Sequence, residues 1–127
     1  MLIDIGVNLS YKRFKEDVEN ILERATQAQI SKLVLTGTSI AESHAVLALC
    51  EQYSEGFPNM LFATCGIHPH DADDLCADSI DRLRALATHS QIVAIGETGL
   101  DFNRNFSSPK AQQLAFEAQL ELAIELN

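Results

Sequence analysis

Residues 92–109, IVAIGETGLDFNRNFSSP, hold a strand, a polar loop and a helix start in direct succession. The apolar run Gln91–Ile95 predicts a short strand that ends at Gly96. Ser108-Pro109 is typical of a helix N-cap followed by proline at the first helical position. Between them, Glu97 carries a charge at a strand end, which is costly unless the group is paired, hydrogen-bonded or bound to a cation. Glu97 is therefore either a functional acid or one half of an ion pair.

The same strand-to-helix alternation precedes this stretch three times. Strands are predicted over Leu2–Val7, Ser31–Leu35 and Met60–Thr64, and helices over Tyr11–Gln29, Ile40–Tyr53, from the N-cap Asp78 to Thr88, and from Pro109 almost to the terminus. Ser39 with Glu42 fits a capping box. Short apolar strands separated by amphipathic helices predict an α/β fold with a parallel sheet, as a single domain over residues 1–127.

The composition argues against several functional classes. A formal net charge of −9 disfavours binding of duplex nucleic acid through a basic face. The sequence has no apolar run near the ~20 residues of a membrane span, and its first residues lack a signal-peptide pattern. We therefore expect a cytoplasmic protein without a membrane partner. Cys50, Cys65 and Cys76 form no CxxC pair, so buried thiols are expected in preference to a zinc ribbon or a disulfide framework.

Polar and glycine residues follow all four predicted strands. They are Gly6 and Asn8, Thr36–Thr38, Gly66–Asp71, and Gly96–Asp101. In parallel α/β folds the carboxyl ends of the strands meet on one face, where ligands bind. We expect these residues to form one site, with Asn8 as a substrate contact.

His68 and His70 alternate around Pro69. On an extended backbone such a pair would point to the same side and could bind a metal or a phosphate. The alternative is that one ring caps a helix and the other lies at the surface. Asp101 and Asn103 could either orient other side chains or simply turn the chain. The sequence has no nucleotide-binding glycine loop and no G-x-S-x-G motif.

Four segments together resemble the TatD family of metal-dependent deoxyribonucleases. They are DIGVNL at 4–9, LTGT at 35–38, GIHPHD at 66–71 and IGETGLDFNRNFSSP at 95–109, in order along the whole chain. The resemblance implies a TIM-barrel metal-dependent hydrolase that cleaves phosphodiester bonds as a 3′-to-5′ exonuclease. It implies that Glu97 is a metal ligand and that His68 lies at the mouth of the site, within reach of a substrate phosphate.

Two features depart from the family pattern. Many relatives carry two metal-binding histidines on strand one, where this chain has Gly6 and Asn8. A typical eight-stranded barrel also needs ~250 residues, so only four of the eight (β/α) units are present here, a half barrel. We expect a fragment whose open strand edges drive self-association.

The resulting hypothesis is metal-assisted hydrolysis of a single-stranded DNA or RNA end by the complete protein. Glu97 and His68 are the expected catalytic residues, Glu97 holds the metal, and His68, His70 and Asn8 bind substrate. The expected cofactor is a divalent cation, Mg²⁺ before Mn²⁺ or Zn²⁺. The alternative is a non-catalytic half barrel that binds a partner chain or a phosphate ligand, because hydrolytic metal centres usually take three or more protein ligands. A receiver-like doubly wound domain fits less well, since it would require a fifth strand.

Overall fold

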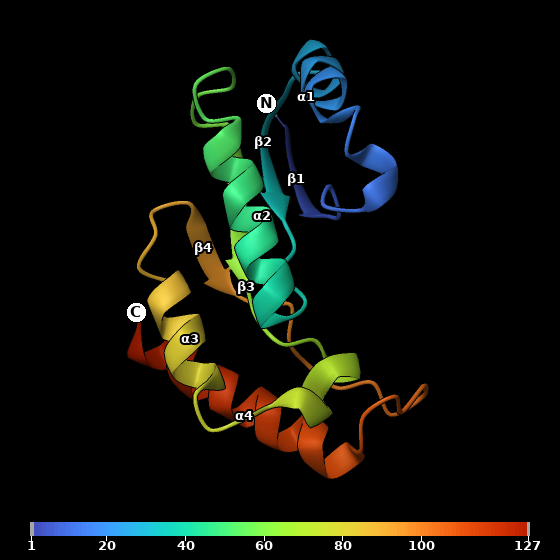
Figure 1. Cartoon of the computed structure of the whole chain (residues 1–127), viewed down its shortest axis with the longest axis vertical. Coiled ribbons are helices and arrows are strands. Elements are labelled where there is room, and N and C mark those ends of the chain that lie inside the picture. Colours follow the sequence, from blue (N-terminus) through green and yellow to red (C-terminus); the bar gives the residue numbers. More distant parts are fainter. Residues whose placement is uncertain (1, 127) are drawn as a thin grey trace.

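The computed structural model describes residues 2–126. Its sheet consists of four parallel strands, β1 (Leu2–Val7), β2 (Ile30–Leu35), β3 (Leu61–Cys65) and β4 (Ile92–Ile95), in the order β1-β2-β3-β4 (Figure 1). Every strand therefore pairs with its neighbour in sequence. This arrangement confirms the predicted α/β class of parallel (β/α) units.

Helices alternate with these strands. They are α1 (Val18–Gln27), α2 (Ile40–Gln52), α3 (Ser79–Leu86) and α4 (Pro109–Glu125), with two 3₁₀ helices, η1 (Lys12–Phe14) and η2 (Pro69–Asp74). In Figure 1, α2 lies in front of the sheet, between α1 and the pair formed by α3 and α4. Buried leucines and valines from the strands and helices form two apolar clusters, one around α1 and α2 and the other around α3 and α4.

The predicted helix over Tyr11–Gln29 is wrong in its first part. The chain forms the short η1 there, and α1 begins only at Val18. Residues 11–16 are exposed except for Phe14, which is partly buried. Without an apolar face to pack on the sheet, this charged segment gains too little from burial to hold a regular helix.

The helix caps follow the sequence only in part. Ser39 accepts a hydrogen bond from the backbone N–H of Glu42, as a capping box requires. The Glu42 carboxylate, however, accepts a hydrogen bond from the Ser10 hydroxyl instead of closing the box. Ser108 caps α4 with Pro109 behind it, as predicted, whereas Asp78 bonds the Cys76 thiol and makes no cap bond.

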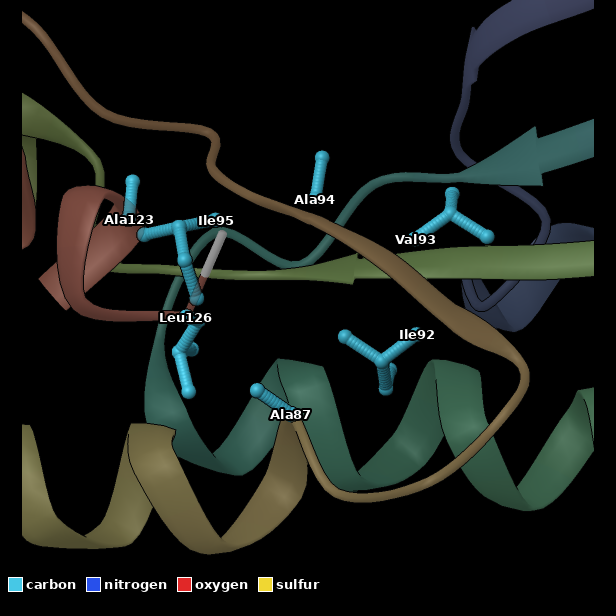
Figure 2. A pocket seen from close by; sticks show the side chains of 7 residues that line it. All are labelled: Ala87, Ile92, Val93, Ala94, Ile95, Ala123 and Leu126. Atoms are coloured by element: carbon cyan, nitrogen blue, oxygen red, sulfur yellow. The ribbon is translucent and has the colours of Figure 1, made fainter.

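The outer strands and one sheet face are open. β1 and β4 are the edges of the sheet within residues 2–126, and Ile5 and Val93 are 74% and 52% exposed. A hollow of about 390 Å³ lies along β4. Figure 2 shows side chains that line it, among them Ile92 and Ile95 of β4, Ala87 just after α3 and Leu126 just after α4. The predicted exposure of edge strands is thus confirmed.

Two of the three cysteines match the expectation of buried thiols. Cys50 and Cys65 are buried, and Cys76 is exposed, so the prediction is wrong for Cys76. Burial raises the pKa of Cys50 to about 12 and that of Cys65 to about 11. Within the described part of the chain, no helix has the length and apolar character needed to cross a membrane.

Candidate active site

The loops that follow β2, β3 and β4 are joined to one another by backbone hydrogen bonds. The His68 N–H donates to the Thr38 carbonyl at 2.7 Å, and the Glu97 N–H donates to the Gly37 carbonyl at 2.7 Å. The Gly96 N–H donates to the Cys65 carbonyl at 2.9 Å. The bonds of His68 and Gly96 continue the pairing of neighbouring strands past the strand ends, and the bond of Glu97 joins the loops after β4 and β2, which β3 separates.

Two glycines permit this close approach. A Cβ on Gly66 would lie 2.5 Å from the carbonyl carbon of Gly96, and one on Gly37 would collide with Thr64 and Ser43. The space that Gly37 leaves open is used by the Ser43 hydroxyl, which accepts a hydrogen bond from the Gly66 N–H at 3.2 Å. Glycine is therefore required at both positions for the loops to converge.

Glu97 and His68 face each other across the ends of β3 and β4. The distance between Glu97 Oε1 and His68 Nε2 is 3.6 Å, slightly beyond a hydrogen bond. His68 Nδ1 accepts the N–H of His70 at 3.1 Å, so a neutral His68 carries its proton on Nε2, toward Glu97. No arginine or lysine engages Glu97 within residues 2–126, and its carboxylate is half exposed.

His70 is held by an acid that the sequence leaves ambiguous. His70 Nε2 lies 2.8 Å from Asp101 Oδ2, and the other carboxylate oxygen of Asp101 accepts the N–H of Arg104 at 3.0 Å. The Arg104 side chain reaches the same carboxylate at 2.6 Å. These bonds, the Arg104 backbone bond first and the His70 bond next, hold the pKa of Asp101 well below its usual range. Asp101 thus both turns the chain and orients another side chain.

The two imidazoles meet edge to face, with ring centroids 4.2 Å apart. The expected cause, an extended backbone, is wrong. His68 is instead the N-cap of η2, and its Nδ1 caps His70, so the chain turns between the two residues. The opposite edge of His70 packs on Phe106 at 4.7 Å between centroids.

Asn8 and Glu97 line one cavity of about 620 Å³ on the open face of the sheet, together with Thr36 and Thr64. Its walls come from all four strands, as the strand-end pattern predicts. Neither His68 nor His70 belongs to its lining, so the histidine pair stands beside the cavity and Glu97 joins the two.

The described residues do not form a metal centre by themselves. No group of three histidine, cysteine or acidic side chains within residues 2–126 is arranged to hold a metal ion. Glu97 offers an oxygen ligand open to solvent, with one imidazole nitrogen nearby. The adjacent Thr98 has a buried hydroxyl with no hydrogen-bond partner in this part of the chain. An unpaired buried hydroxyl costs about 1–3 kcal/mol, which is consistent with a group that these residues do not supply.

Sequence reasoning missed two residues that shape the site, the buried glutamines Gln112 and Gln119 of α4. It left the role of Asp101 open between turning the chain and orienting another side chain, and the bond to His70 shows that Asp101 does both. The only available signal was that both glutamines fall on the inner face of the last helix, among apolar residues.

Comparison with known proteins supports the resemblance seen in the sequence. Residues 3–127 match the family model described as "TatD related DNase". A relative from Dickeya dadantii, described as "3'-5' ssDNA/RNA exonuclease TatD", is 48% identical over 124 residues, covering 98% of this chain and 46% of the relative. The chain spans about half the length of the curated relatives it matches.

Solved structures give the same result. A TatD homolog from Escherichia coli k12 superposes with a TM-score of 0.83 at 30% identity, covering 98% of this chain and 47% of that protein. A hydrolase described as a TatD family protein, from Entamoeba histolytica, superposes with a TM-score of 0.87 at 27% identity, covering 98% of this chain and 46% of that protein. The four (β/α) units therefore correspond to under half of these structures.

Proposed function

Since the chain belongs to the family of TatD-related DNases, we propose that it supplies the Glu97 and His68 half of a metal-dependent phosphodiesterase. The proposed substrate is the 3′ end of single-stranded DNA or RNA, as in the name of the Dickeya dadantii relative. The observation that carries this proposal is the meeting of Glu97 and His68, at 3.6 Å, above the ends of two parallel strands. We place the protein in the cytoplasm, in keeping with its three free thiols.

Hydrolases of this family are metal-dependent in general, and we propose Mg²⁺, with Mn²⁺ or Zn²⁺ as alternatives. Glu97 is the ligand that this chain would contribute, because carboxylate oxygens are the ligands that Mg²⁺ prefers. A bound divalent ion would stabilise negative charge on the phosphoryl group and lower the pKa of a water molecule. Because no three-ligand group lies within residues 2–126, we propose that further ligands complete the centre.

The chain's own residues would orient the substrate. The Nε2–H of His68 can donate to a non-bridging phosphoryl oxygen, because Nδ1 is already occupied by the N–H of His70. His70 is fixed by Asp101 and presents its ring edge to His68. The Asn8 amide lines the cavity next to Glu97, where it can bond a sugar or base of the terminal nucleotide.

The experiment is a nuclease assay of the complete protein on a 5′-labelled single-stranded oligonucleotide with Mg²⁺ or Mn²⁺, against a chelator control. Shortening from the 3′ end that needs metal, and that Glu97→Gln abolishes, supports the proposal. Glu121→Gln is the matched control, because Glu121 is an exposed acid on α4. Activity that survives Glu97→Gln contradicts the role of Glu97.

A second function is favoured by one observation, the lack of a three-ligand metal group within residues 2–126. The chain would then be a non-catalytic half barrel that binds a partner chain or a phosphate ligand. Under this alternative, we expect no cleavage above that of the chelator control, and we expect binding of inorganic phosphate or of a partner polypeptide. The same assay, followed by calorimetric titration with phosphate, separates the two.

We also propose that the partner of the open edges is a second copy of this chain. All four strands are parallel, and the edges are β1 and β4. A two-fold axis along the strand direction would place β4 of one copy beside β1 of the other in parallel orientation, at two equivalent junctions. Such an arrangement would cover both edges and the open sheet face at once.

A further inference from the structure

Two glutamines of α4 are fully buried, although glutamine is mostly an exposed residue. Gln112 and Gln119 lie about two helical turns apart, on the face of α4 that meets the rest of the molecule. Each amide bonds both the N–H and the carbonyl of a single residue in a loop at the site. A side chain that pairs with one residue in this double manner fixes both the position and the rotation of that segment of backbone.

Gln112 holds the loop after β4. Its Oε1 accepts the N–H of Asp101 at 2.7 Å, and its Nε2 donates to the carbonyl of Asp101 at 3.3 Å. The second amide hydrogen reaches the carbonyl of Ser107 at 2.9 Å, within the same loop. Asp101 is the residue that bonds His70, so Gln112 sets the backbone from which that carboxylate extends.

Gln119 holds the loop after β3 in the same manner. Its Oε1 accepts the N–H of Ile67 at 2.7 Å, and its Nε2 donates to the carbonyl of Ile67 at 3.1 Å and to that of Ala115 at 2.9 Å. Ile67 directly precedes His68. One helix therefore holds both loops that meet at the histidine pair.

These residues contribute to more than packing. A methionine has a similar volume and could fill either position, but it would leave the N–H and carbonyl of Asp101 or of Ile67 without their present partners. What methionine cannot do is fix the two loops at a set distance along the rigid axis of α4. The double hydrogen bonds therefore point to control of geometry.

We propose that Gln112 and Gln119 are positioning residues, through which α4 aligns the Asp101 loop with the histidine loop and so sets the relative orientation of the His68 and His70 rings. This inference rests on the proposed function, because it concerns the same site. Its test measures the geometry of the rings and not cleavage. A complete protein that orients the rings but cleaves no oligonucleotide would contradict the proposed function and leave the positioning role standing.

The test is nuclear magnetic resonance of the imidazole nitrogens in the whole chain, in Gln112→Met and Gln119→Met. Gln112→Met should shift the ring resonances of His70 and remove the signal of its hydrogen-bonded Nε2 proton, and Gln119→Met should shift those of His68. The exposed His44 and His89 serve as internal references. Gln113→Met is the matched control, because Gln113 neighbours Gln112 but is exposed. Unchanged His68 and His70 signals in folded variants, or equal shifts of all four histidines, would overturn the proposal.

A second measurement covers variants that fail to fold. In the unaltered chain, the amide protons of Ile67 and Asp101 each donate to a glutamine oxygen. They should exchange with solvent about tenfold more slowly than neighbouring loop amides without such a bond, as expected for one hydrogen bond. Exchange at the rate of an open loop would show that the glutamines do not hold these residues, and would overturn the proposal without any substitution.

Discussion

Asp101 shows how one carboxylate can serve a turn and a site together. One of its oxygens accepts the N–H of Arg104, and the other lies 2.8 Å from His70. The charged form is favoured by these bonds, so the pKa of Asp101 lies below that of the same residue in an unfolded chain, near 3.8. Folding therefore gains stability from Asp101 at pH values above about 4 and loses that stability as the pH falls further.

Asp101→Asn should consequently remove a pH-dependent part of the free energy of unfolding. We expect the difference between the unaltered chain and the variant to be constant at about pH 4.5–5.5 and to shrink as the pH falls toward about 3, where an unfolded aspartate is protonated. Urea denaturation at each pH measures it. Other carboxyl groups with a lowered pKa, such as that of Asp17, are present in both proteins, so their effects on the difference cancel. A difference that stays constant down to about pH 3 would contradict a lowered pKa of Asp101.

The sequence predicts some residues of the site and not others. Glu97 and His68 lie two and three residues after the ends of apolar strands. Because parallel strand ends meet on one face, the proximity of the two residues can be inferred from the sequence. No comparable sequence pattern identifies Asp101, Gln112 and Gln119. Their partners lie up to 52 positions away in sequence and depend on how α4 docks. A local pattern cannot give the angle at which a helix packs.

At the scale of elements, the site depends on strand-end loops that touch backbone to backbone. Gly66 lies so close to Gly96 that a methyl group has no space, whereas nothing lies within 4 Å of a Cβ built on Gly56. The two glycines therefore separate a steric requirement from the general effect of removing a glycine.

Gly66→Ala should destabilise the chain by about 1–3 kcal/mol, because the added methyl group must push β3 and β4 apart. Gly56→Ala should change stability by under about 1 kcal/mol, since it only restricts the unfolded chain. Urea unfolding monitored by circular dichroism compares the two. Equal effects of both substitutions would refute the close packing of these loops.

Most elements were predictable to within one or two residues. α4 begins at the predicted proline, and β1 matches its predicted bounds although its side chains are largely exposed. The start of α1 was not predictable from periodicity, because Phe14 continues the apolar spacing while its neighbours stay in solvent. η2 could not be predicted from periodicity, because its Pro and Asp content suits a loop as well as a 3₁₀ helix.

At the scale of the whole molecule, the unpaired edges control behaviour in solution. Val93 lies on β4 and is 52% exposed, while β1 presents an apolar row that includes Ile5. An edge strand of this kind pairs readily with another chain unless a charge blocks it.

Val93→Lys should therefore shift the chain from dimer toward monomer in sedimentation equilibrium, because a lysine on the edge cannot be buried without a partner. Ala48→Lys is the control, since it adds the same charge on the exposed side of α2. A dimer that persists in Val93→Lys would place the interface elsewhere, and a folded monomer of the unaltered chain at high concentration would refute the assembly.

The strand order β1-β2-β3-β4 also bears on how the chain forms during synthesis. Each new strand meets a partner that has already left the ribosome, and no strand has to wait for a later one or insert between two that are paired. The sheet can therefore grow in one direction as the chain is synthesised, by one strand and one helical connection at a time. The newest strand is then always the unpaired edge of the sheet. A nascent chain paused after any one of these units would present the same kind of acceptor edge to whatever polypeptide follows.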